Sequence, residues 1–65
     1  MQVLSEVWLL DCLPQGALAP TIGARTHFSA KTDGVHIELD GQFVTLAFNG
    51  RHVGIPLARV QRWEV

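Results

Sequence analysis

The sequence predicts an all-β protein, built as a small β-barrel or a strongly curled antiparallel meander of five to six strands. Three dipeptides typical of two-residue hairpin turns divide its second half: Asp33-Gly34, Asp40-Gly41 and Asn49-Gly50. Between them, apolar and polar residues alternate with the period of two expected of half-buried strands. The chain has 65 residues, so we expect one small domain over residues 1–65.

Residues 1–13 are expected to form a strand that is buried on both faces. A helix would place Val3, Val7 and Leu10 along one side equally well. We favour the strand because Val and Trp prefer sheets and no capping residue precedes them. The following residues 14–26 are expected to form a long loop, because they contain Pro14, Gly16, Pro20 and Gly23.

Residues 27–57 are expected to form a four-stranded antiparallel meander with one apolar face. When each dipeptide is taken as a two-residue loop, the three registers agree about which residues share a face. The apolar face then holds Phe28, Ala30, Val35, Ile37, Leu39, Val44, Leu46, Phe48, Val53, Ile55 and Leu57. The opposite face holds His27, Ser29, Lys31, His36, Glu38, Phe43, Thr45, Ala47, His52, Gly54 and Pro56.

The end of the chain is expected to turn once and add a last strand. Pro56 cannot donate a ladder hydrogen bond, so it ends the fourth strand or lies at a sheet edge. Residues 57–59 then form a single tight turn before a strand over residues 60–65. Because no helix is left to cover the apolar face, the sheet must curl on itself or pack against a second copy.

The segment Ile55-Pro56-Leu57-Ala58-Arg59-Val60 resembles the closing segment of SH3-like barrels. In those barrels an Ile-Pro strand end, a 3₁₀ turn and a final strand with a Val seal the fold. The stretch from Gln42 to Val60 is also similar in rhythm to the last strands of Sm-like RNA-binding proteins. Small phage-encoded proteins of unassigned role end in a comparable way. The resemblance therefore implies an SH3-like barrel and a phage origin.

Composition and charge exclude several classes of protein. Hydrophobic residues make up 48% of the chain, which excludes an intrinsically disordered protein. A net charge of −1 excludes a polybasic binder of nucleic acid or membranes. A secretory signal is not expected, because no Lys or Arg precedes Arg25 and because Glu6 and Asp11 interrupt the apolar stretch. We therefore expect a soluble, cytoplasmic protein.

The residues that could carry chemistry do not form a known constellation. The three histidines fall on different strands, Glu38 lacks the neighbouring His that nucleophilic catalysis needs, and the glycines are spaced as turns. The lone Cys12 is expected to be a small buried apolar residue. We expect no enzyme, no metal site and no cofactor.

The composition favours a small protein-binding or assembly module. The chain carries more apolar residues than one small core can hide, and aromatic residues on uncharged patches are typical of protein interfaces. The candidate interface residues are Phe43 and Pro56, which face each other, and Trp8 and Trp63, which lie on expected sheet edges. We expect self-association, with a dimer favoured, or binding of a host or phage protein. Alternatively, this apolar patch covers the N-terminal segment within one chain.

Nucleic-acid binding is the second function that the sequence suggests. Arg59, Arg62 and Trp63 stand close together near the C-terminus, and Arg51 lies at the last hairpin turn. Arginines beside an aromatic residue on a small SH3-like or Sm-like barrel can neutralise and stack on a single strand. Solvated arginines on a strand surface would show the same pattern.

Overall fold

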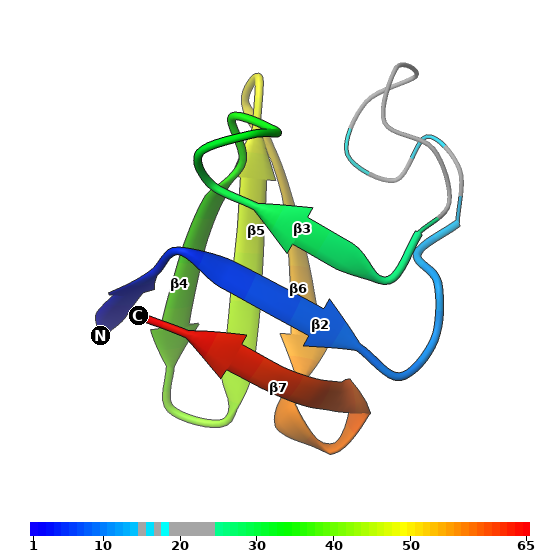
Figure 1. The fold of residues 1–65 in the computed structure, drawn as a ribbon, viewed down its shortest axis with the longest axis vertical. Coiled ribbons are helices and arrows are strands. Elements are labelled where there is room, and N and C mark those ends of the chain that lie inside the picture. The colour runs from blue at the N-terminus through cyan, green and yellow to red at the C-terminus, as the bar shows by residue number, and fades with distance from the viewer. Residues whose placement is uncertain (15, 17, 19–24) are drawn as a thin grey trace.

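The computed structural model describes residues 1–14, 16, 18 and 25–65, and it shows an all-β protein (Figure 1). Two antiparallel sheets lie against each other, with strand orders β1-β4-β5-β6 and β3-β2-β7. The strands are β1 (Gln2–Leu4), β2 (Glu6–Leu9), β3 (His27–Ser29), β4 (His36–Asp40), β5 (Phe43–Phe48), β6 (Arg51–Pro56) and β7 (Val60–Glu64). A 3₁₀ turn at Leu57–Arg59 precedes β7, as predicted.

The predicted all-β class is confirmed, but the predicted number and arrangement of strands are not. The described residues contain seven strands instead of five to six. The strands form two separate sheets that are not closed into a barrel. The expected long loop over residues 14–26 lies largely outside the described residues.

The N-terminal segment is extended, as predicted, but Ser5 divides it between the two sheets. β1 pairs with β4, whereas β2 runs between β3 and β7. The buried side chains are Leu4, Val7 and Leu9, so the period of two is interrupted once, across Ser5. The prediction that this strand is buried on both faces is therefore wrong, and Val3 and Leu10 are exposed.

The β5–β6 hairpin has the predicted register. Val44 lies opposite Ile55 and Leu46 opposite Val53. Asn49 and Gly50 form the loop, with φ angles of 50° and 80°. Two positive φ angles are what a type I′ turn requires, and this explains the choice of Asn-Gly.

The β4–β5 hairpin keeps the predicted faces with a register shifted by two residues. Asp40 pairs with Phe43, so the loop consists of Gly41 and Gln42 instead of Asp40 and Gly41. Gly41 has a φ of 62°, which suits the first loop position of a type II′ turn. A shift of two residues leaves every side chain on its predicted face.

The predicted hairpin at Asp33-Gly34 is wrong. β3 pairs with β2, and β4 pairs with β1, so β3 and β4 belong to different sheets. The Asp33 carboxylate accepts the Ser29 N–H at 2.8 Å, and the Asp33 N–H donates to the Ser29 carbonyl at 2.9 Å. Asp33 also pairs with Arg25 at 3.0 Å. This turn carries the chain from one sheet to the other.

The core lies between the two sheets, on the face that the sequence predicts. Every residue predicted for the apolar face is buried or half-buried. The buried core is completed by residues outside the predicted meander, namely Leu4, Val7, Leu9, Leu18 and Val60. The other face of the sheet formed by β1, β4, β5 and β6 is left as an outer surface.

Candidate protein-binding site

Phe43 and Pro56 lie side by side on the outer face of the four-stranded sheet. They pair across β5 and β6, as predicted. Their neighbours Val44 and Ile55 are buried in the core, so alternation along the strands turns Phe43 and Pro56 outward. Phe43 remains 53% exposed. A large apolar side chain is therefore presented on a sheet surface.

β1 does not cover this face, whereas residues 11–14 share the lining of one pocket with Gly54 and Pro56. β1 pairs with β4 and forms the edge of the sheet next to it. Val3 pairs with Glu38 and is itself 59% exposed. β1 thus extends the sheet instead of covering Phe43. This arrangement favours the intermolecular explanation of the patch over the intramolecular one.

Small side chains lie next to the Phe43–Pro56 pair. Thr45 pairs with Gly54 in the adjoining row of the sheet. Gly54 is exposed, and a Cβ atom built on it would meet no atom within 4 Å. The same face therefore carries a bulky apolar pair and an open space beside it.

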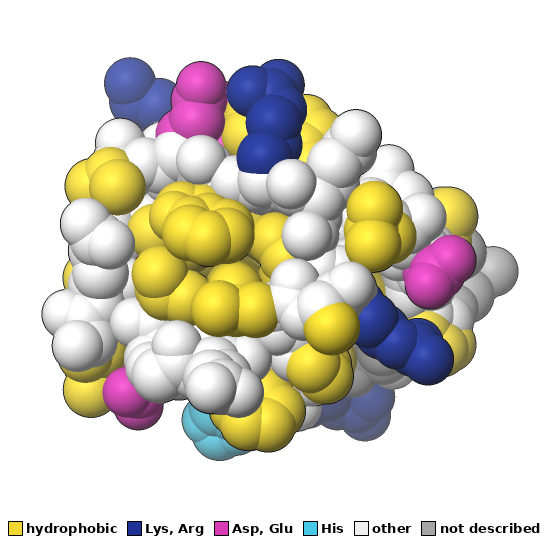
Figure 2. Space-filling view, turned by 90° about the horizontal axis from the view of Figure 1, so that it is seen from below, with side chains coloured by type: hydrophobic (Ala, Val, Ile, Leu, Met, Phe, Trp, Pro, Cys, Tyr) yellow, Lys and Arg dark blue, Asp and Glu magenta, His cyan; other side chains and the backbone are white. Residues whose placement is uncertain are grey.

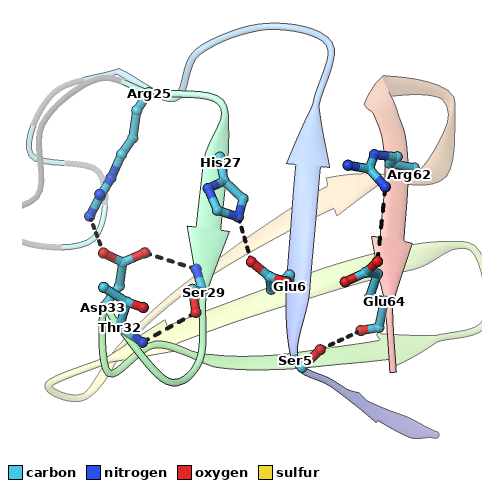
Figure 3. A network of polar contacts seen from close by, with 9 residues as sticks. All are labelled: Ser5, Glu6, Arg25, His27, Ser29, Thr32, Asp33, Arg62 and Glu64. Atoms are coloured by element: carbon cyan, nitrogen blue, oxygen red, sulfur yellow. Dashed lines mark hydrogen bonds and ion pairs between the residues drawn. The ribbon is translucent and has the colours of Figure 1, made fainter.

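Trp8 lies on the outer face of the other sheet and is already partnered. β2 is the central strand, so the expectation that Trp8 lies at a sheet edge is wrong. His27 of β3 stacks on the indole ring at 4.7 Å between centroids. The Arg62 guanidinium of β7 lies 3.7 Å from the ring centroid. His27 in turn contacts Glu6 at 2.9 Å (Figure 3).

Sequence reasoning missed this polar cluster around Trp8. Its members come from three strands, and two of these are separated by the long loop. No local turn fixes the β2–β3 register, so no signal in the sequence could have brought Trp8 to His27. The cluster leaves Trp8 half-buried, which makes it a weak candidate for an interface.

Trp63 lies at the predicted sheet edge, on the core-facing side of β7. It pairs with the buried Val7, so the two side chains share a face. Trp63 is nevertheless 38% exposed. Seen from below, the molecule has an apolar patch at its centre (Figure 2). Phe43 and Trp8 therefore lie on the outer faces of different sheets, whereas Trp63 lies on the core-facing side of an edge strand.

The arginines proposed to bind nucleic acid are not gathered on one surface. Arg51, at the β5–β6 turn, lies at the opposite end of the molecule from the 3₁₀ turn that ends at Arg59 (Figure 1). Arg51 donates to the Gly16 carbonyl at 3.3 Å. Arg62 lies over Trp8, on the other face of β7 from Trp63. A nucleic-acid base that stacks on Trp63 would therefore lie on one face of β7, whereas the Arg62 guanidinium that should neutralise its phosphate lies on the other face.

One open pocket, of about 360 Å³, lies between the segment after β2 and β6. Its lining includes Leu9, Cys12, Leu13, Ile55 and Arg59. Cys12 is exposed here, so the prediction that it is buried is wrong. Asp11 and Arg59 supply the only charged side chains of this lining, and no ion pair joins them.

The chain matches no protein-family model, no curated protein and no solved structure. Among the residues that the structure describes, no three His, Cys, Asp or Glu side chains gather where they could hold a metal ion. The same residues include no helix that is long and apolar enough to span a membrane.

Proposed function

We propose that this chain is a small protein-binding and assembly module that associates with a second copy of itself. The contact surface is the outer face of the sheet formed by β1, β4, β5 and β6. The observation that carries the proposal is the exposed Phe43, which pairs with Pro56 on a face that β1 leaves open. Aromatic side chains of this kind are enriched at protein interfaces and at their energetic centres.

A second copy is the occupant that the face fits best. A two-fold axis brings the same patch of two molecules together, so each patch must complement itself. Here the bulky Phe43 and the open space above Gly54 lie on one face, and Phe43 of each copy can enter the space of the other. The net charge of −1 opposes this approach only weakly.

We also propose that the fold is a variant of the SH3-like barrel. The 3₁₀ turn at Leu57–Arg59, between the edge strand β6 and the final strand β7, supports this. So does the N-terminal chain, which contributes a strand to each sheet. A phage origin and a cytoplasmic location stay predictions from the sequence.

Substituting Gly54 tests the proposed contact without disturbing the core. The added side chain of Gly54→Val meets open space, so we expect the monomer to melt no lower than the parent. The same side chain fills the space that receives Phe43 of the other copy. We therefore expect the dissociation constant of the dimer to rise at least about tenfold, which corresponds to 1.4 kcal/mol. Gly54→Ala should show a smaller effect in the same direction. Unchanged association of Gly54→Val, measured by sedimentation equilibrium, would contradict the contact.

A further inference from the structure

β7 is an edge strand whose outer side is paired with no described strand. Its residues after Val60 are all exposed. The Glu64 carbonyl accepts the Ser5 N–H at 2.8 Å, so the peptide groups of Glu64 point toward β2. Because the direction alternates along a strand, the N–H and C=O of Trp63 point to the free edge. Unpaired groups of this kind are a template for another strand.

The charges on β7 select one register for pairing with a second copy. When two β7 strands run antiparallel with Trp63 at the centre, Arg62 of each copy lies opposite Glu64 of the other. Centring the pair on Arg62 instead would place two arginines opposite each other, which destabilises a strand pair. Within one chain, Arg62 and Glu64 are only loosely paired at 4.0 Å (Figure 3). Neither side chain is therefore held in a close ion pair within its own chain, although the Arg62 guanidinium lies over Trp8.

The register centred on Trp63 also gives the free backbone groups hydrogen-bond partners and brings the two indole rings together. Two Trp63 residues that face each other with outward peptide groups form a hydrogen-bonded pair and exchange two N–H···O bonds. Their indole rings lie on the same face of the joined sheet and close to each other, as a cross-strand aromatic pair. That face is the core-facing one, which Trp63 shares with the buried Val7.

We propose that β7 pairs antiparallel with β7 of a second copy about a two-fold axis at Trp63. The two three-stranded sheets then become one sheet of order β3-β2-β7-β7-β2-β3. This contact lies on the other sheet from Phe43 and adds a second self-association surface to the proposed function. A chain that uses both surfaces forms assemblies larger than a dimer.

Disulfide cross-linking tests the register directly, in a Cys12→Ser background that leaves no other thiol. Hydrogen-bonded partners have Cα atoms about 5.5 Å apart, inside the roughly 4.4–6.8 Å that a disulfide spans. Trp63→Cys should therefore yield a covalent dimer under mild oxidation. In the matched control Gln61→Cys the two thiols are offset by four residues, about 13 Å along the strands, and should not cross-link. No dimer from Trp63→Cys, or equal dimer from both variants, would overturn the proposal.

Charge reversal provides a second test that retains Trp63. Glu64→Arg places arginines opposite one another across the β7 contact, and we expect association through β7 to weaken at least about tenfold. Asp11→Arg makes the same change in net charge at an exposed site outside β7 and should have no effect. The double variant Arg62→Glu with Glu64→Arg restores opposite charges across the contact. It should regain most of the affinity that Glu64→Arg loses. A double variant that associates as weakly as Glu64→Arg would contradict the register centred on Trp63.

The charge-reversal measurements are made in the Phe43→Ser background, which separates the two surfaces. We expect Phe43→Ser alone to remain a dimer, joined through β7. A Phe43→Ser protein that is fully monomeric would overturn the β7 proposal and leave the proposed function in place. A Phe43→Ser protein that associates like the parent would overturn the Phe43 contact instead.

Discussion

Gly50 occupies a backbone conformation that side chains with a branched Cβ resist. Its φ is 80°, and Asn49 before it has a φ of 50°. We expect Gly50→Val to lower the free energy of unfolding by more than about 1 kcal/mol, because an L-residue in this region strains its own backbone. Thermal or urea melting measures the change.

Gly54→Val is the matched control for that substitution. Gly54 lies in the same hairpin, but its φ is outside the left-handed region and open space surrounds its Cβ position. At a protein concentration low enough for the parent to be monomeric, the control should therefore melt like the parent. If Gly50→Val also melts like the parent, the Asn49-Gly50 turn does not require positive φ angles and does not fix the β5–β6 register.

Phe43 and Leu46 lie on opposite faces of the same strand and should respond differently to truncation. Leu46 is 0% exposed, so Leu46→Ala should cost about 2–5 kcal/mol and unfold much of the protein. Phe43→Ser should leave the melting of the monomer nearly unchanged and weaken its association, because the ring is 53% exposed. The comparison uses thermal melting beside size-exclusion mass. A Phe43→Ser variant that melts as poorly as Leu46→Ala, with its assembly unchanged, would place Phe43 in an intramolecular core.

At the scale of elements, Asp33 closes the turn that carries the chain between the sheets. Its half-buried carboxylate accepts the Ser29 N–H and pairs with Arg25. We expect Asp33→Ala to lower the free energy of unfolding by about 1–3 kcal/mol, because the Ser29 N–H loses its partner. Chemical denaturation measures this loss. Lys31→Ala, in the same turn with an exposed side chain, serves as the control and should change it by less than about 0.5 kcal/mol.

The hairpins were predictable because their signals are local. Asn49-Gly50 sets the β5–β6 register through its own φ angles, and alternation along the strands then identifies the core. Gly41 marks the β4–β5 turn, but the sequence does not say which of its neighbours completes the loop. The resulting error of two residues preserves the faces. The pairing of Phe43 with Pro56 was predicted for the same reason, since both belong to one hairpin.

The connections between sheets were not predictable because they depend on contacts far apart in the sequence. Asp33-Gly34 resembles a hairpin turn, yet the Asp33 side chain bonds back to Ser29 and redirects the chain. The break at Ser5 becomes visible only when β1 and β2 find different partners. The stacking of Trp8 on His27 depends on the same non-local pairing.

At the scale of the whole molecule, the surfaces differ in what they can bind. The arginines are dispersed, and Trp63 faces away from Arg62 across β7. We therefore expect little quenching of tryptophan fluorescence when oligonucleotides are added at low salt. Strong quenching that weakens as salt is raised would favour the nucleic-acid alternative, because phosphate contacts depend steeply on salt.

The mass of the unmodified protein in solution shows whether the chain associates with itself. A single chain has a mass of 7.2 kDa. If the molecule is a self-associating module, sedimentation equilibrium over a wide range of protein concentrations should give an average mass that rises from this value to a dimer and beyond. A mass that stays at that of one chain at the highest concentration would contradict the account.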